Sequence, residues 1–266
     1  MSIEQDDFMA DIEACKKIAE QALCLDHPKG APDRYLIDRA YRVFKLCNGI
    51  AQLNDVKRFQ TDRESLALAA LFRDTGFARY AQRENTIYLP PSSELTEEDM
   101  RDFSAQVVQE KLSAMLDSRQ VERVCNIILE SGRRDTTLIE AMILSDACNL
   151  DDMGAVGLCS EFRRSGIQGR GIIEFLKSWK RKVEYDYWSA RLRESFRFDS
   201  VRQIAQNRLE SAKLVMEQLE QENRAADLDK ILAGQKQVLH GPISEIPEAP
   251  AKKPTESITN KPSHTQ

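Results

Sequence analysis

Two charged residues directly follow one of the most apolar stretches of the chain. In LAALFRDTGF, residues 68–77, Arg73 and Asp74 come after a run of leucine, alanine and phenylalanine. Burying an ionised side chain costs free energy unless an opposite charge or a metal ion compensates it. Asp74 could hold a divalent cation, whereas an arginine has only N–H donors and cannot be a metal ligand. Both residues therefore need partners elsewhere in the chain.

Candidate nitrogen and sulfur ligands are few. The histidines are His27, in a polar turn, and His240 and His264, close to the C-terminus. A lone histidine in a polar turn is more often solvated than bound to a metal. Six cysteines are scattered without a C-x-x-C pair, which is typical of reduced packing residues rather than of a disulfide frame or a zinc site.

The composition excludes several classes of protein. The chain has 266 residues, of which 41% are hydrophobic, and a formal net charge of −5. This length suffices for a hydrophobic core, and the acidity disfavours a nucleic-acid partner. No apolar stretch reaches the roughly 20 residues of a membrane span, so we expect no membrane partner. An acidic first segment is atypical of a signal peptide, so we expect a cytoplasmic protein.

Apolar residues recur at three- and four-residue spacing along most of the chain, which predicts an all-α fold. Residues 78–95, with PPSS, are expected to form a loop. We expect one helical domain over residues 1–237 and a disordered, proline-rich tail over residues 238–266. The tail could simply aid solubility or could dock on a partner. The expected helices cover residues 3–24, 35–53, 63–74, 136–150, 157–164, 171–193 and 199–224, with one more beginning at the Thr96–Asp99 capping box and another ending at Gly132.

Three segments together resemble the HD-domain superfamily of metal-dependent phosphohydrolases. They are YLIDRAYRVFKLCNGIA, LAALFRDTGF and LIEAMILSDACNLDDMGAVGL. The corresponding family patterns read H-D-x-x-H-x-x-R-V, L-A-A-L-L-H-D-I-G and I-L-Q-D-A-D-R-L-D-A-L-G. Residues 175–222 also resemble the closing helices of small bacterial HD proteins. The resemblance implies an HD-domain-like helical bundle and a phosphorylated small molecule as ligand.

This chain has other residues at most of the metal-binding positions of these patterns. When Arg42 is matched to the R-V arginine, Arg39 and Arg73 stand at histidine positions, whereas Asp74 and Asp146 match aspartates. Without nitrogen ligands, a site cannot hold a transition metal that activates water for attack on phosphorus. The resemblance therefore implies a degenerate metal site, with no resident cofactor.

The same substitutions predict the partners of Asp74. We expect Arg39 and Arg73 to form a buried or half-buried ion-pair cluster with Asp74 and Asp146 in place of the metal. The alternative is that the arginines reach solvent and Asp74 merely caps a helix.

Other polar residues are weaker candidates for this site. Asp151 and Asp152 could lend oxygens to a cation, although two acids that follow a helix are more often solvated. Arg42 and Lys180 are candidate phosphate contacts, although a structural salt bridge is at least as plausible for Arg42 and a solvated face more plausible for Lys180. Tyr185, Tyr187 and Trp188 are expected to pack on neighbouring helices.

Three functions fit this pattern. The favoured one is a non-catalytic HD-superfamily protein, a pseudoenzyme that binds a small phosphorylated ligand or a protein partner. The alternative is a phosphohydrolase of a nucleotide or another phosphate ester that uses Mg²⁺ or Mn²⁺ held by Asp74 and Asp146. A scaffold acting through the tail or the last long helix is the third. The pattern therefore leans against enzymatic activity but leaves the question open, and any activity would be hydrolysis of phosphate esters or anhydrides.

Overall fold

The computed structural model describes residues 3–26, 30–86 and 95–239, and these residues fold into α-helices. Within them no β-strand occurs, and one isolated bridge joins Leu25 to Asp33. The predicted all-α fold is therefore confirmed. His27, the histidines near the C-terminus and nearly all of the predicted tail lie outside the described residues.

The chain divides into two units, Met1–Glu220 and Gln221–Gln266. The first unit contains every residue of the predicted cluster. The described helices are α1 Ile3–Leu23, α2 Tyr35–Ile50, α3 Arg63–Phe72, α4 Thr75–Arg83, α5 Glu97–Leu112, α6 Ser118–Glu130, α7 Ile139–Asp151, α8 Gly154–Ile167, α9 Ile172–Glu184, α10 Tyr187–Glu194, α11 Asp199–Asn223 and α12 Ala226–Leu239.

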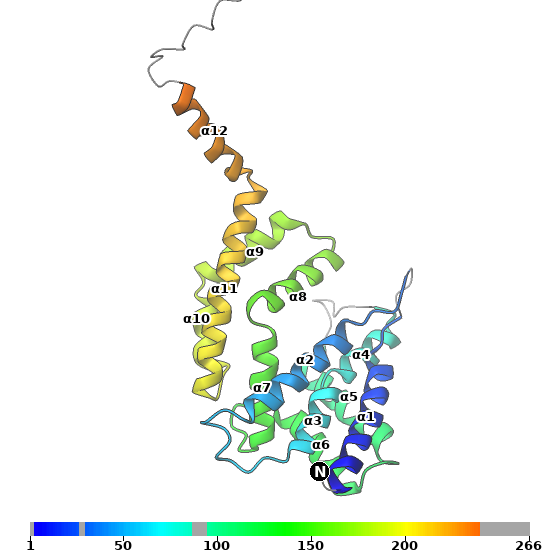
Figure 1. Cartoon of the computed structure of the whole chain (residues 1–266). Helices are drawn as coiled ribbons and strands as arrows, with labels where there is room; N and C mark the ends of the chain where they lie inside the picture. The colour runs from blue at the N-terminus through cyan, green and yellow to red at the C-terminus, as the bar shows by residue number, and fades with distance from the viewer. Residues whose placement is uncertain (1–2, 27–29, 87–94, 240–266) are drawn as a thin grey trace, which may run out of the picture. The chain divides into compact units, whose positions relative to one another are not determined.

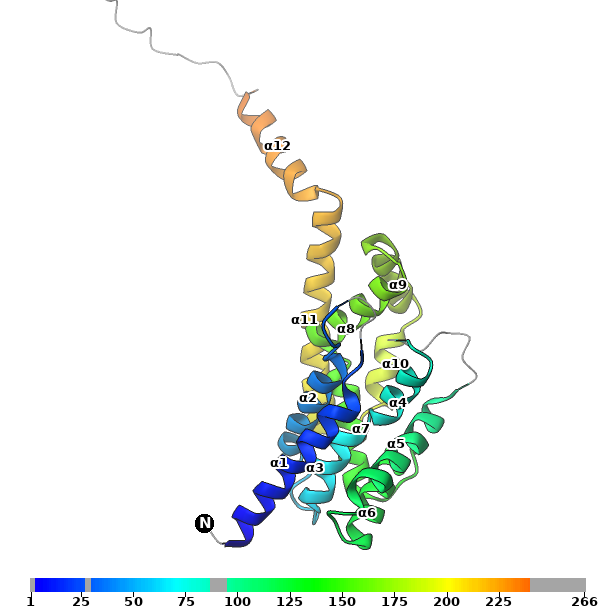
Figure 2. The same ribbon diagram turned by 90° about the vertical axis from the view of Figure 1, so that its right-hand side faces the viewer.

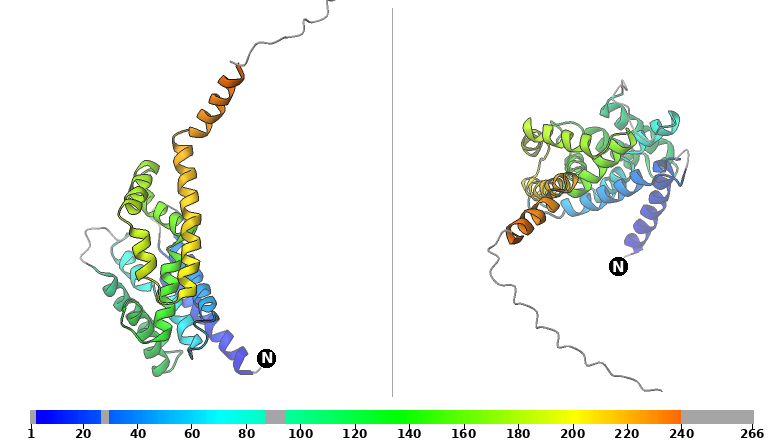
Figure 3. Two further views of the ribbon diagram at one scale, coloured as in Figure 1. Left: turned by 90° about the vertical axis from the view of Figure 1, so that its left-hand side faces the viewer. Right: turned by 90° about the horizontal axis from the view of Figure 1, so that it is seen from above.

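Helix α3 forms the centre of the first unit. All of its residues from Ser65 to Phe72 are buried, and α2, α6 and α7 pack around it. Helix α1 lies on one side of this group and α11 on the other (Figures 1 and 3). Helices α4, α5 and α6 lie together on the side away from α11 (Figure 2). The continuous apolar run of α3 follows from this position, because a helix surrounded by others has no polar face.

Helix α4 corrects the sequence prediction, which placed a loop from residue 78. It extends to Arg83 and buries only small residues, Gly76, Ala78 and Ala81, together with Thr75. The helix has only 9 residues, fewer than the roughly 11–18 over which helical periodicity is recognised in a sequence. Residues 87–94 of the predicted loop lie outside the described part of the chain.

Two helix boundaries have clear local causes. Thr96 and Asp99 form the predicted capping box, in which the Thr96 hydroxyl accepts from the Asp99 backbone and the Asp99 side chain accepts from the Thr96 backbone. The helix expected over 171–193 is broken into α9 and α10 at Asp186, whose φ of 53° is left-handed. A non-glycine residue rarely adopts this conformation, and it ends the helical hydrogen-bond ladder there.

In the second unit, α12 has an apolar stripe of three exposed residues at helical spacing, Leu228, Ile231 and Leu232. Among the described helices, none combines the length and apolar character that crossing a membrane requires.

Candidate functional site

Asp74 lies between two arginines that neutralise it. The Arg39 guanidinium, on α2, donates to one oxygen of the Asp74 carboxylate, and the Arg73 guanidinium donates to the other. Asp74 and Arg39 are both buried, whereas the Arg73 side chain is 23% exposed. The part of the expected cluster that contains these three residues is therefore present.

The sharp connection between α3 and α4 fixes this arrangement. The Ser104 hydroxyl, on α5, donates to the Arg73 carbonyl oxygen at 2.7 Å and accepts from the Gly76 N–H at 2.8 Å. A Cβ at Gly76 would lie 2.0 Å from the Met100 carbonyl oxygen, so only glycine fits this close approach to α5. Arg73 and Asp74 are thereby held at the junction, where their side chains can face Arg39.

The arginines decide the ionisation of Asp74. Burial by itself would raise the pKa of this carboxyl, but the charges and hydrogen bonds of Arg39 and Arg73 hold the pKa well below its ordinary value. Asp74 is therefore an anion at neutral pH, and both of its oxygens accept hydrogen bonds from guanidinium groups.

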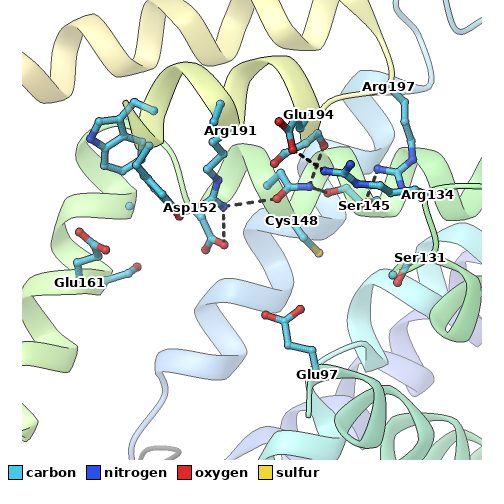
Figure 4. A pocket seen from close by; sticks show the side chains of 18 of the residues that line it. Glu97, Ser131, Arg134, Ser145, Cys148, Asp152, Glu161, Arg191, Glu194 and Arg197 are labelled. Carbon is cyan, nitrogen blue, oxygen red and sulfur yellow. Dashed lines mark hydrogen bonds and ion pairs between the residues drawn. The ribbon is translucent and has the colours of Figure 1, made fainter. Parts of the chain in front are cut away.

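The ion-pair network continues from Arg39 to the end of α7. Arg39 lies 3.6 Å from Asp151 and 3.4 Å from Asp152, measured between the nearest nitrogen and oxygen atoms. Asp151 also accepts two hydrogen bonds from Arg42, at 2.7 and 3.1 Å. Asp152 accepts from Arg191 of α10 at 3.2 Å (Figure 4). Asp151 is 2% exposed, so it is a structural partner of Arg42 and Arg39 rather than a solvated residue.

Asp146 has different partners from those expected. It is fully buried, and its carboxylate accepts from the backbone N–H groups of Arg197 and Phe198 at 3.0–3.1 Å. The Arg197 guanidinium approaches only to 3.9 Å. Burial raises the pKa of Asp146 to about 6, against the lowering effect of the two backbone donors. Asp146 therefore anchors the segment that precedes α11, and no contact with Arg39 or Arg73 is found within the described residues.

Cys148 lies beside the arginines instead. The residue is 8% exposed, and burial raises the pKa of its thiol although Arg73 and Arg39 both act to lower it. Asp146 and Cys148 are two positions apart on α7, so they point in different directions from the helix. The family pattern given above has an aspartate at the position of Cys148. The aspartate of the pattern could have indicated that the residue at position 148 belongs to the site.

A cavity of about 690 Å³ opens beside this network. Helices α5, α7, α8, α9 and α10 and the segment after α6 line it, and its wall includes Arg73, Cys148, Asp152 and Arg191 (Figure 4). Among the described residues that line it, seven are cationic and four are acidic. The cavity is thus locally positive in a protein whose net charge is −5, which favours an anionic ligand. The cationic residues are Arg73, Arg101, Arg134, Arg164, Lys182, Arg191 and Arg197.

A second cavity, of about 340 Å³, is lined by Arg39, Arg73 and Asp74 among others. Its wall includes apolar side chains, among them Leu36, Phe77 and Met100. The two cavities share six lining residues, which makes them neighbours. The shared residues are Arg73, Glu97, Arg101, Asp152, Ser160 and Arg164.

The residues predicted to contact phosphate lie outside both cavities. Arg42 is engaged by Asp151, and Lys180 pairs with Glu220 at 2.6 Å. Lys182, from the same basic run, does line the larger cavity. Trp188 packs on Trp179 with ring centroids 5.1 Å apart, as expected, but it also lines the larger cavity. Sequence reasoning missed this cavity because its wall is assembled from five helices.

Within the described part of the chain, no group of three or more histidine, cysteine, aspartate or glutamate side chains is arranged to hold a metal ion. The negative charges nearest the expected site are instead engaged by arginines. Asp74 forms ion pairs with Arg39 and Arg73, and Asp152 forms ion pairs with Arg39 and Arg191.

The sequence matches no protein-family model and no curated protein. Its fold is similar to the crystal structure of Bacillus subtilis YpgQ in complex with ADP, with a TM-score of 0.54 and 20% identity over 81% of this chain and 96% of that one. The Lin1889 protein from Listeria innocua is similar with a TM-score of 0.52 and 20% identity, over 82% of this chain and 97% of that one. At this level of identity, the likenesses show a shared all-α fold.

Proposed function

We propose that this protein is a non-catalytic binding module of the HD-domain type, and that its larger cavity binds a small phosphorylated ligand. The observation that supports a non-catalytic role is that arginines engage the carboxylate of Asp74. Both of its oxygens accept from guanidinium groups, of Arg39 and of Arg73, at the position where the resembled family uses histidines and an aspartate to hold a metal. Each oxygen of this carboxylate already faces a guanidinium group, so a metal ion would have to compete with a cation for it.

The charge of the cavity supports a phosphorylated ligand. Seven cationic side chains line a volume of about 690 Å³, which lies within the roughly 300–1,000 Å³ of small-molecule sites. Guanidinium groups, which form most of this cationic wall, bind phosphate oxygens through paired N–H donors. The similar fold of YpgQ, whose crystal structure contains ADP, makes a nucleoside diphosphate a suitable first probe.

The hydrolase alternative needs Asp74 and Asp146 to bind Mg²⁺ or Mn²⁺ together. Asp146 is fully buried and accepts from two backbone N–H groups, whereas Asp74 faces the arginines. Each carboxylate already has its own donors, so this arrangement favours binding over hydrolysis.

The first test is a calorimetric titration of the full chain with ADP and with inorganic pyrophosphate, at low and at moderate salt. We expect saturable binding that weakens as salt rises, because the cavity recognises charge. The second test is a hydrolysis screen with nucleotides and added Mg²⁺ or Mn²⁺. Turnover that is abolished by Asp74→Ala would contradict the non-catalytic proposal. The absence of saturable binding would contradict the ligand proposal.

A third experiment asks whether the arginines stand at a metal position. The double variant Arg39→His, Arg73→His places two imidazoles beside Asp74 and removes two positive charges. We expect Co²⁺ or Zn²⁺ to raise the melting temperature of this variant progressively with metal concentration, while wild type shows no comparable shift. A folded double variant without this shift would contradict the placement.

A further inference from the structure

Arg101 is a nearly buried cation without a close anionic partner. Its side chain is 13% exposed, and its Nε atom is buried without a hydrogen-bond partner among the described residues. Within the described residues, Arg101 forms an ion pair with Glu97, one turn earlier on α5, at 3.8 Å. Glu97 is itself 88% exposed, so this contact is weak and easily exchanged. A buried guanidinium in this state lacks the charge compensation that such groups normally have.

The position of Arg101 depends on Gly132, which follows α6. A Cβ at Gly132 would lie 2.2 Å from Cζ of Arg101 and 2.3 and 2.6 Å from its two terminal nitrogens. The guanidinium therefore lies directly on the glycine, in space that any other side chain would fill. The clash involves the flexible end of an arginine, so alanine at this position would displace the guanidinium rather than disrupt the backbone.

Arg101 faces both cavities. The two cavities share three cationic residues, Arg73, Arg101 and Arg164. Arg73 is engaged by Asp74, whereas Arg164 is exposed, and no ion pair is found for it within the described residues. Ser160 also lies on this shared wall, with its hydroxyl donating to the Val156 carbonyl oxygen at 3.1 Å. The shared wall thus carries three cations and two acids, and Arg101 is the most deeply buried of the cations that have no close acid.

We propose that Arg101, held in place by Gly132, is the anchoring cation for the phosphate of the ligand, with Arg73 and Arg164 as its neighbours. This inference rests on the proposed binding of a phosphorylated ligand and adds the atoms that bind it. The phosphate takes the place of Glu97 at Arg101. Charge-assisted N–H···O bonds from guanidinium groups then supply the compensation that the free protein lacks.

Three variants test the assignment, each by titration of the full chain with ADP and with inorganic pyrophosphate. Arg101→Gln removes the charge, and we expect at least ~10-fold weaker binding. Gly132→Ala leaves every charge in place but displaces the guanidinium, and it should weaken binding in the same direction. Glu97→Gln removes the competing carboxylate, and it should strengthen binding by a few-fold.

Two matched controls separate the site from general effects. Arg133→Gln makes the same charge change outside the walls of both cavities, at a residue that is 60% exposed and paired with Glu130. Gly49→Ala makes the same glycine change on α2, where nothing lies within 4 Å of the added Cβ. Both should bind within about 2-fold of wild type, because neither touches Arg101. Circular dichroism and melting temperature establish that each variant is folded.

The outcomes separate this inference from the proposed function. If wild type binds neither probe, the proposed function fails and the anchoring role fails with it. If wild type binds and folded Arg101→Gln and Gly132→Ala bind equally well, the cavity has another phosphate subsite and only the anchoring role is overturned. A loss in Arg133→Gln as large as that in Arg101→Gln would also overturn it, because general electrostatics would then suffice.

Discussion

The two aspartates of the expected cluster, Asp74 and Asp146, are both buried in the first unit but are stabilised in opposite ways. Asp74 accepts from the side chains of Arg39 and Arg73, which hold its pKa well below the ordinary value. Asp146 accepts from backbone N–H groups of the segment before α11, and burial raises its pKa to about 6. At Asp74 the full charges of the arginines outweigh desolvation, so the pKa falls. At Asp146 the backbone dipoles are too weak to outweigh desolvation, so the pKa rises.

This difference separates a site from a structural anchor. The Asp74 network reaches the walls of both cavities through Arg73 and Asp152, so a change in it alters the charge that lines them. The bonds of Asp146 hold the start of α11 in place. Variants of the two networks should therefore differ in size, in pH dependence and in their effect on ligands.

The largest effect is expected for Arg39→Ala. Arg39 contacts Asp74, Asp151 and Asp152, so its removal leaves buried carboxylates short of positive charge. We expect a loss of about 3–5 kcal/mol in the free energy of unfolding, measured by urea titration. The double variant Arg39→Met, Asp74→Asn should lose less, because the orphaned charge is removed as well. An Arg39→Ala variant as stable as wild type would show that these ion pairs do not contribute to folding.

Arg73→Ala should have an intermediate effect. The Arg73 side chain is 23% exposed, and without it Asp74 still accepts from Arg39. We expect a loss of about 1.5–3 kcal/mol by the same measurement. A larger loss than for Arg39→Ala would reverse the order of the two arginines and place Arg73 at the centre of the network.

Stability against pH should distinguish the two aspartates by sign. The folded pKa of Asp146, about 6, is above its unfolded value, so the protein gains protons on folding between about pH 4 and 6. The contribution of Asp146 to stability is full below pH 4 and is lost as pH rises through 6. Asp146→Asn cannot ionise, so it should gain about 2 kcal/mol relative to wild type between pH 4.5 and 7.5.

Asp74→Asn is the control for this pH experiment. The folded pKa of Asp74 is lowered, so its contribution is present above the unfolded pKa and is lost only as pH falls toward the folded value. The deficit of Asp74→Asn relative to wild type should therefore stay nearly constant between pH 4.5 and 7.5. Parallel pH profiles for both variants would contradict the difference between the two carboxylates.

The smallest effect is expected for an exposed pair. The Lys180 side chain is 47% exposed where it contacts Glu220. Lys180→Ala should change the free energy of unfolding by less than about 1 kcal/mol, and the change should shrink as salt is added. A loss comparable to that of Arg73→Ala would show that ion pairing itself, rather than burial, sets the energies of these networks.

Some parts of the site could be predicted from the sequence and others could not. Arg39, Arg73 and Asp74 could be expected together because the resemblance to the HD-domain patterns aligns Arg39 and Arg73 with histidine positions and Asp74 with an aspartate. The partners of Asp146 could not be predicted, because they are backbone groups 51 and 52 residues away. Backbone N–H groups are present at every residue but proline, so the sequence carries no signal for which of them are used.

By itself, the sequence determined the all-α fold and most of the helices, because 3.6-residue periodicity is a local property of the chain. It also determined that Arg39 and Arg73 cannot act as metal ligands, because arginine has no lone pair to donate. Only the tertiary structure decided that Cys148 rather than Asp146 lies beside them, and that Arg101 lies on Gly132, 31 residues away, between two cavities. Those choices depend on how helices rotate and pack against one another, and the free energy of packing is a sum over contacts between distant segments.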